Sequence, residues 1–262
     1  MVLSEEQVEA FERLGGLLIP GLFSAEEAGV LRQAMAEMSD PAKDSVLLDA
    51  AGGLRMVYGL HRDHGAFDAL SRHPRLAGPC LQLIGAPIYV YQSRLNIKPG
   101  LDRSAAPGYP WHQDFSTWHL RDGIPDPRVL VTFVFLDDVT ACNAPLMYIP
   151  GSHHETALGL SRERPEDGAY YETPSDRVAR AAGEGGVEAA LGPAGSVFLM
   201  HCNLVHASGE NISPLRRALC SMIFNAVDNQ PMVVADQPEV LVARDYTPIE
   251  LLDDDCLLRF AA

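Results

Sequence analysis

The chain has 262 residues, 47% of them hydrophobic and 21% charged, which is typical of a globular protein and excludes a disordered or fibrous one. Acidic residues outnumber basic ones by 35 to 20, and the net charge of −15 disfavours nucleic acid and anionic membranes as partners. We expect a small-molecule partner and a monomer or homodimer.

The five cysteines predict neither a disulfide framework nor a structural zinc site, because they are scattered, odd in number and form no C-x-x-C pair. The first ten residues lack the basic and apolar regions of a signal peptide. No apolar run approaches the roughly 18 residues that a membrane span needs. We therefore expect a cytoplasmic protein without membrane association, in which residues 1–262 form a single domain.

The first part of the chain is predicted to be helical. Ser4 with Gln7 and Ser24 with Glu27 have the spacing of capping boxes, and the second pair opens a helix that runs to about Met38. A third helix is predicted over residues 66–83, and short strands over residues 46–48 and 54–58.

From Pro87 onward the pattern becomes that of strands. Residues 88–97 are rich in β-branched and aromatic side chains, and residues 129–136 form an almost continuous apolar run that suits a strand buried on both faces. Further strands are predicted over residues 146–149, 196–200 and 218–226. Short strands joined by Pro and Gly turns predict a mainly β sandwich or barrel with the early helices packed against it.

Residues 155–191 interrupt this alternation. They are polar, contain several Gly and Pro residues, and predict only one short helix near residues 175–182. A long insertion in a compact domain is usually an active-site lid or a disordered segment. We interpret it as a lid insertion.

The motif that points to chemistry is the segment WHQDF, which contains His112 and Asp114. On an extended chain, residues two apart point the same way, so these two side chains can converge on one ion. H-x-D alone is a weak signal. It gains weight from His206, near the end of a second β-like stretch, because two histidines and one carboxylate leave three octahedral positions open. That arrangement is typical of Fe(II) oxygenases rather than of closed structural zinc sites.

His201 competes with His206 for the role of third ligand. It follows the apolar residues 198–200, which suits a core histidine, and we favour His206. The other histidines show no evident metal geometry: His61, His64, His73, His119, His153 and His154.

Three open positions are what a 2-oxoglutarate dioxygenase needs, two for the keto acid and one for O₂. The distal carboxylate of 2-oxoglutarate calls for a guanidinium, and Arg217 follows His206 past a turn, at the start of the next strand. An Arg–carboxylate pair contributes about 1.5–3 kcal/mol and fixes orientation. We expect Arg217 to point inward and Arg216 to be a surface charge.

Together these motifs resemble the phytanoyl-CoA dioxygenase family. The resemblance lies in residues 111–125 (WHQDFSTWHLRDGIP), residues 146–153 (LMYIPGSH) and the pattern H-x-S…N-I-S-P-x-x-R from His206 to Arg217. Within the family, the chain is similar to ectoine hydroxylases and to bacterial hydroxylases of free amino acids. The similarity runs from about Leu17 to the last strand.

The resemblance implies a double-stranded β-helix, a jelly-roll or cupin-like core, that uses Fe(II), 2-oxoglutarate and O₂. It implies three iron ligands: His112, Asp114 and His206. It implies three contacts to 2-oxoglutarate: Arg217, Ser208 and Asn96. It also places Gln92 and Trp118 at positions that contact the substrate in ectoine hydroxylases.

The wall of the substrate pocket can be sketched from the same stretch of chain. Gln92, Arg94 and Asn96 alternate onto one face of a strand, which fits a polar wall. Ser221 falls where ectoine hydroxylases carry an aromatic side chain that packs on ectoine. This departure argues against ectoine, and residues 238–248 resemble the amino-acid hydroxylases, so we expect a free L-amino acid or a close derivative to be hydroxylated.

Three alternatives stay open at this point. The same chemistry can act on ectoine, a carrier-bound residue or a natural-product intermediate, and desaturation or epoxidation can use the same ligand set. A metal-binding jelly roll without oxygenase activity, or a zinc hydrolase, is the third, because two histidines and an aspartate also hold zinc. Asp114 argues against a halogenase, since related halogenases carry Gly or Ala there.

Overall fold

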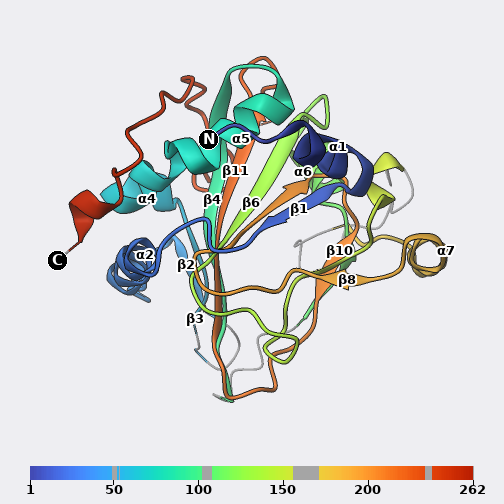
Figure 1. Cartoon of the computed structure of the whole chain (residues 1–262), viewed down its shortest axis with the longest axis horizontal. Helices are drawn as coiled ribbons and strands as arrows, with labels where there is room; N and C mark the ends of the chain where they lie inside the picture. Colours follow the sequence, from blue (N-terminus) through green and yellow to red (C-terminus); the bar gives the residue numbers. More distant parts are fainter. Residues whose placement is uncertain (49–51, 53, 102–107, 156–170, 234–237, 262) are drawn as a thin grey trace.

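The structure, a computed structural model, describes residues 1–48, 52, 54–101, 108–155, 171–233 and 238–261. Within these ranges, two antiparallel sheets lie against each other with helices along one side (Figure 1). The large sheet has seven strands in the order β1-β9-β6-β11-β4-β3-β2, and the small sheet has four in the order β5-β10-β7-β8. The expected sandwich with packed helices is confirmed.

The strands are β1 (Gly16–Ile19), β2 (Val46–Leu48), β3 (Leu54–Tyr58), β4 (Ile88–Lys98), β5 (Tyr109–His112), β6 (Val129–Phe135), β7 (Met147–Tyr148), β8 (Glu188–Ala189), β9 (Val197–His201), β10 (His206–Ser208) and β11 (Arg217–Ala226). The helices are α1 (Glu5–Leu14), α2 (Ala25–Met38), α3 (Leu60–Asp63), α4 (Gly65–Ser71), α5 (Pro74–Ile84), α6 (Asp114–Asp122) and α7 (Ser175–Gly185), with short 3₁₀ helices η1 (Ser152–His154) and η2 (Leu258–Phe260).

The two predicted capping boxes are present at the starts of α1 and α2. The single helix predicted over residues 66–83 is wrong, because the chain forms α4 and α5 with a break at His73. The residue before a proline avoids the helical region, and Pro74 suits the first turn of a new helix. His73 is extended, and its side chain caps α5 by accepting a hydrogen bond from the amide of Arg75.

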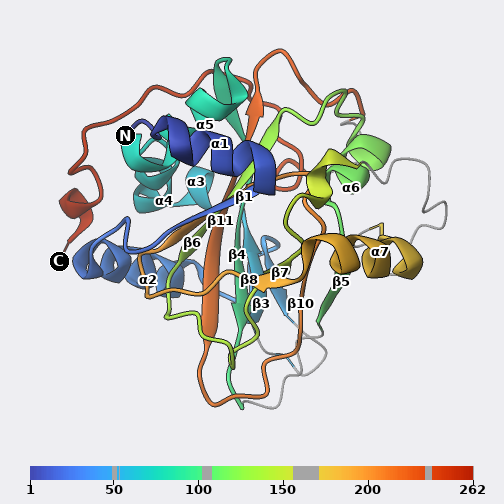
Figure 2. The same cartoon turned by 45° about the vertical axis from the view of Figure 1, so that its right-hand side comes forward.

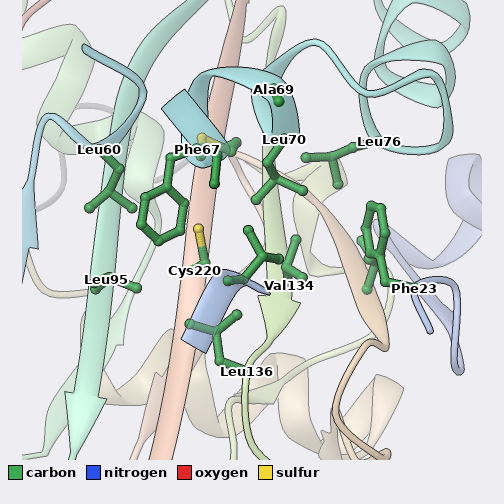
Figure 3. Packing of buried hydrophobic residues seen from close by; sticks show 14 of the residues in the cluster. Phe23, Leu60, Phe67, Ala69, Leu70, Leu76, Leu95, Val134, Leu136 and Cys220 are labelled. Atoms are coloured by element: carbon green, nitrogen blue, oxygen red, sulfur yellow. The ribbon is translucent and has the colours of Figure 1, made fainter. Parts of the chain in front are cut away.

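One face of the large sheet packs against α2, α4 and α5. All ten residues of β11 are buried, and every second one, such as Cys220, belongs to the hydrophobic cluster on the helix side. Figure 3 shows Cys220 and its register partner Val134 close to Phe67 and Leu70 of α4. Burial on both faces explains the long apolar runs of β6 and β11.

The opposite face of the large sheet lies toward the small sheet (Figure 2). A second hydrophobic cluster joins the two sheets, and in it the ring of Tyr148 from β7 lies 4.9 Å from that of Phe198 in β9. The alternate residues of β11, including Arg217 and Ser221, share this face. The space between the two sheets is where the chemistry-bearing side chains gather.

The predicted lid insertion divides into parts of different kinds. Residues 156–170 lie outside the described ranges. Its later part forms α7, and β8 then joins the small sheet by pairing with β7. A lid therefore stays a prediction for the segment before α7.

None of the helices in the described ranges combines the length and the apolar composition that a membrane crossing requires. All five cysteines carry free thiols.

Gly195 offers a test of how β9 is connected to the helical layer. Its φ is +87°, and a Cβ at this position would collide with the carbonyl oxygen of Phe23. We expect Gly195→Ala to lower the free energy of unfolding by roughly 3 kcal/mol, because a left-handed backbone and a clash with main chain add up.

Gly21→Ala is the matched control, since Gly21 has a φ of +59° but a Cβ added there would meet no atom within 4 Å. It should lose only about 1 kcal/mol. Urea unfolding followed by fluorescence measures both values, and equal losses in the two variants would contradict the steric account.

Candidate metal centre

Three buried side chains from β5, α6 and β10 meet between the sheets. His112 ends β5 and His206 begins β10, and the two residues are register partners with ring centroids 4.2 Å apart. The Nε2 atoms of His112 and His206 lie 3.7 and 3.8 Å from the carboxylate oxygens of Asp114. One ligand atom from each residue lies within 4.8 Å of the others, so the group can hold a metal ion.

The path by which Asp114 reaches this point differs from the expected extended chain. Gln113 is extended, but Asp114 is the first residue of α6, a helix that the sequence analysis did not predict. A carboxylate in the first turn of a helix is favoured by the unpaired backbone amides there. The strand-to-helix turn therefore aims the side chain and favours its negative charge.

Backbone carbonyls fix the orientation of both imidazoles. The Nδ1 atom of His112 lies 2.7 Å from the carbonyl oxygen of Pro110, and that of His206 lies 2.9 Å from the carbonyl oxygen of Leu204. A carbonyl only accepts, so each Nδ1 donates and each Nε2 keeps its lone pair for the centre. Histidine ligands of metals are commonly held in this way.

The charge state of the three groups suits a divalent cation. Burial raises the pKa of Asp114, but the imidazoles and the guanidinium of Arg94 outweigh it and hold the pKa at about 2. Burial lowers the pKa of His206 to about 4. Neither oxygen of Asp114 has a hydrogen-bond partner among the described residues, and a buried carboxylate of this kind is costly without a counter-charge. A metal ion fits this donor set.

A narrow cavity extends from the three ligands between the sheets. Its wall consists of His112 and His206 together with Arg94, Asn96, Tyr109, Phe133, Leu146, Ala207, Ser208, Arg217, Leu219 and Ser221. We call this space the cavity below. It is polar at the metal end and again around Arg217, with apolar side chains between.

Arg217 brings a buried guanidinium to the cavity. Its Nε donates to the carbonyl of Ala144 at 3.2 Å, and its Nη1 donates to Oδ1 of Asn96 at 2.9 Å. Within the described ranges its Nη2 has no hydrogen-bond partner, and no carboxylate forms an ion pair with it. Burial lowers the pKa of Arg217 to about 10, so the group is charged at neutral pH.

Arg216 points the other way, as expected. It is exposed, and two hydrogen bonds of 2.8 Å link it to Asp137. The alternation of a strand accounts for the opposite directions of these neighbours.

The structure brings four other predicted site residues to the cavity: Asn96, Ser208, Arg94 and Ser221. Gln92 and Trp118 do not line it. The amide of Gln92 donates to the carbonyl of Leu241, and Trp118 packs edge-on against Tyr91 with ring centroids 5.5 Å apart.

His201 lies apart from the three-residue group. It ends β9 opposite Leu130, and its ring centroid lies 5.2 Å from that of His153. Its Nδ1 accepts a hydrogen bond from the amide of Asn203. The metal-competent group in the described chain therefore contains His206 and not His201.

Tyr109 and Lys98 are two residues at the Arg217 end of the cavity that the sequence analysis did not identify. Tyr109 pairs with Ser208 across the small sheet, and Lys98 pairs with Arg217 across the large one. The signal for Lys98 was its place two residues after Asn96 on the same strand face.

Known proteins resemble this chain in sequence and in structure. The model of the family "Phytanoyl-CoA dioxygenase (PhyH)" matches residues 11–219. The ectoine dioxygenase of Streptomyces coelicolor is 34% identical over 95% of this chain and 87% of the relative. The L-proline trans-4-hydroxylase of Streptomyces griseoviridis is 36% identical over 94% of this chain and 95% of the relative.

Among solved structures, EctD from S. alaskensis with 2-oxoglutarate and 5-hydroxyectoine superposes with a TM-score of 0.83 and 32% identity. The match covers 95% of this chain and 87% of that one. A second structure of EctD contains bound Fe. The jelly-roll core of such enzymes is the architecture that the two sheets form here.

The two candidate third ligands give a matched pair of variants. We expect His206→Ala to weaken Mn(II) binding by at least about 100-fold, because it removes one of three donors. His201→Ala should bind Mn(II) like the unaltered protein. Isothermal titration of the metal-free protein measures both affinities, and a loss in His201→Ala alone would reverse the assignment.

Proposed function

The chain belongs to the phytanoyl-CoA dioxygenase family, and from that premise we propose that it hydroxylates a free L-amino acid or a close derivative of one. The coarser part of this function is established: the protein is a 2-oxoglutarate-dependent non-haem iron dioxygenase that uses Fe(II), 2-oxoglutarate and O₂. This removes the zinc hydrolase and the inactive jelly roll as alternatives. The substrate and the roles of individual residues are the proposal.

Iron is held by His112, Asp114 and His206. The orphaned carboxylate of Asp114 between two Nε2 lone pairs is the observation that carries this assignment. When bound, iron couples the oxidative decarboxylation of 2-oxoglutarate to succinate and CO₂ with insertion of one oxygen atom into a carbon–hydrogen bond. The three protein donors occupy one face of the metal and leave the other for the cosubstrates.

Arg217 binds the distal carboxylate of 2-oxoglutarate. Its guanidinium is buried, is held in place by Asn96 and by the carbonyl of Ala144, and keeps Nη2 available. Ala144 has a φ of +58°, which is unusual for a residue with a side chain, and this backbone presents its carbonyl to Arg217. Ser208 lines the same end and can donate its hydroxyl to the carboxylate.

Arg94 and Ser221 favour a substrate that carries a carboxylate. They are register partners on β4 and β11, both are buried, and both line the cavity on the metal side of Arg217. The guanidinium of Arg94 lies 3.8 Å from Asp114, so it brings a positive charge to the reacting region. The hydroxyl of Ser221 has no hydrogen-bond partner among the described residues. Together they can accept an α-carboxylate.

The relatives leave ectoine as the alternative substrate, since several of them are named ectoine dioxygenase. The L-proline trans-4-hydroxylase is matched at a similar identity and over more of its length. Ser221 decides our preference, because a small hydroxyl offers little packing surface to a ring. We also propose a cytoplasmic location, which the five free thiols support.

The substrate class is tested by succinate release. The purified protein with Fe(II), 2-oxoglutarate and O₂ is offered the twenty L-amino acids, their N-acetyl and amide derivatives, and ectoine. We expect turnover with one or a few free amino acids and a loss of at least about tenfold in kcat/KM when the carboxylate is converted to an amide. Turnover of ectoine alone would contradict the proposal, and mass spectrometry of the product separates hydroxylation from desaturation.

Arg217 and Arg216 form a matched pair for the cosubstrate. We expect Arg217→Ala to raise the apparent KM for 2-oxoglutarate by roughly 10- to 100-fold, the equivalent of one charged hydrogen-bonded pair. Arg216→Ala removes an exposed ion pair and should leave this KM within about twofold. Steady-state kinetics against 2-oxoglutarate measure both, and an unchanged KM in Arg217→Ala would remove it from the cosubstrate site.

A further inference from the structure

Lys98 is a buried cation to which the iron, cosubstrate and substrate assignments give no role. It is the last residue of β4, its side chain is 1% exposed, and its register partner on β11 is Arg217. The alternation of the strand puts it on the same face as Asn96 and Arg94, which line the cavity. The chain has one other lysine, Lys43, and that one is exposed.

The contacts of Lys98 place it directly behind the wall of the cavity. Its Nζ donates to the carbonyl oxygens of Ser208, at 3.5 Å, and of Gly209. It also lies over the ring of Tyr109, 5.4 Å from the centroid. Ser208 and Tyr109 are register partners that both line the cavity. Lys98 therefore holds the point where β10 ends against β5.

Two buried cations stand side by side at this end of the cavity. Among the described residues, no carboxylate lies within 4.0 Å of the Nζ of Lys98 or of the guanidinium of Arg217. Burial, followed by the charges of Arg217 and Arg55, lowers the pKa of Lys98 to about 7, and the more distant Glu210 opposes this weakly. In a chain with a net charge of −15, adjacent buried cations without an acidic partner indicate a site for an anion.

We propose that Lys98 is a positioning residue of the cosubstrate site, which together with Arg217 forms a two-cation end that selects the distal carboxylate of 2-oxoglutarate. This inference rests on the proposed placement of that carboxylate at Arg217. Arg217 makes the direct contact. Lys98 acts from behind the wall, through its charge and through its hold on the main chain of Ser208.

The two contributions of Lys98 make different demands on the ligand. The charge matters only for a keto acid that carries a distal carboxylate, because Coulomb attraction in a buried site acts over several ångströms. The hold on Ser208 shapes the cavity for any keto acid. A ligand of the same length without the distal carboxylate therefore separates an electrostatic role from a purely structural one.

The experiment measures binding to the Mn(II)-loaded full-length protein without O₂, by isothermal titration. The ligands are 2-oxoglutarate and 2-oxopentanoate, which has a methyl group in place of the distal carboxylate. The variants are Lys98→Met, Lys98→Arg, and Lys43→Met as the exposed control. We expect Lys98→Met to bind 2-oxoglutarate about tenfold more weakly and 2-oxopentanoate within about twofold of the unaltered protein. Lys98→Arg should recover most of the loss, and Lys43→Met should show none.

Two results would overturn the inference: unchanged affinity of Lys98→Met for 2-oxoglutarate, or an equal loss for both keto acids. Arg217→Met in the same assay separates this from the wider proposal. A loss in Arg217→Met with none in Lys98→Met sinks the role of Lys98 alone. No loss in either variant sinks the orientation of 2-oxoglutarate as well. The identity of the amino-acid substrate does not enter the measurement.

Discussion

A buried carboxylate between two imidazoles is the constraint on which the rest of this structure depends. Asp114 is fully buried without a hydrogen-bond partner among the described residues, so its negative charge is tolerated only where cations or partial positive charges surround it. The first turn of α6 and the guanidinium of Arg94 supply part of that charge. A divalent metal supplies the remainder, and this explains why so polar a group lies at the centre of a sandwich.

The geometry of that centre is set by strand register more than by any single residue. His112 and His206 are 94 positions apart in sequence, but the pairing of β5 with β10 puts them directly opposite each other. A slip of one residue would turn one imidazole to the other face of the small sheet. The helix-covered large sheet behind it, buried on both faces, supplies the rigid support that a preorganised site requires.

Charge is distributed along the cavity in a way that runs against the composition of the chain. The protein is strongly acidic, yet the wall from the metal to the far end carries Arg94, Arg217 and, just behind it, Lys98. Acidic side chains on the surface keep the protein soluble. Cations inside, in a low-dielectric space, bind carboxylates of the cosubstrate and substrate more strongly than they would at the surface. Acidic composition and anion binding are therefore compatible here.

The sequence by itself determined the class of chemistry. The H-x-D motif, His206 and Arg217 indicated a 2-oxoglutarate dioxygenase, and strong local signals such as the capping boxes at Ser4 and Ser24 predicted helices that the structure contains. These succeeded because ligand identity and helix capping are local properties of the chain. Tertiary structure decided what local pattern could not: that Asp114 begins a helix, that His206 rather than His201 joins the group, and that Lys98 lies beside Arg217. Each of these depends on which distant strands pair, and pairing is settled by the packing of both sheets and the helices together.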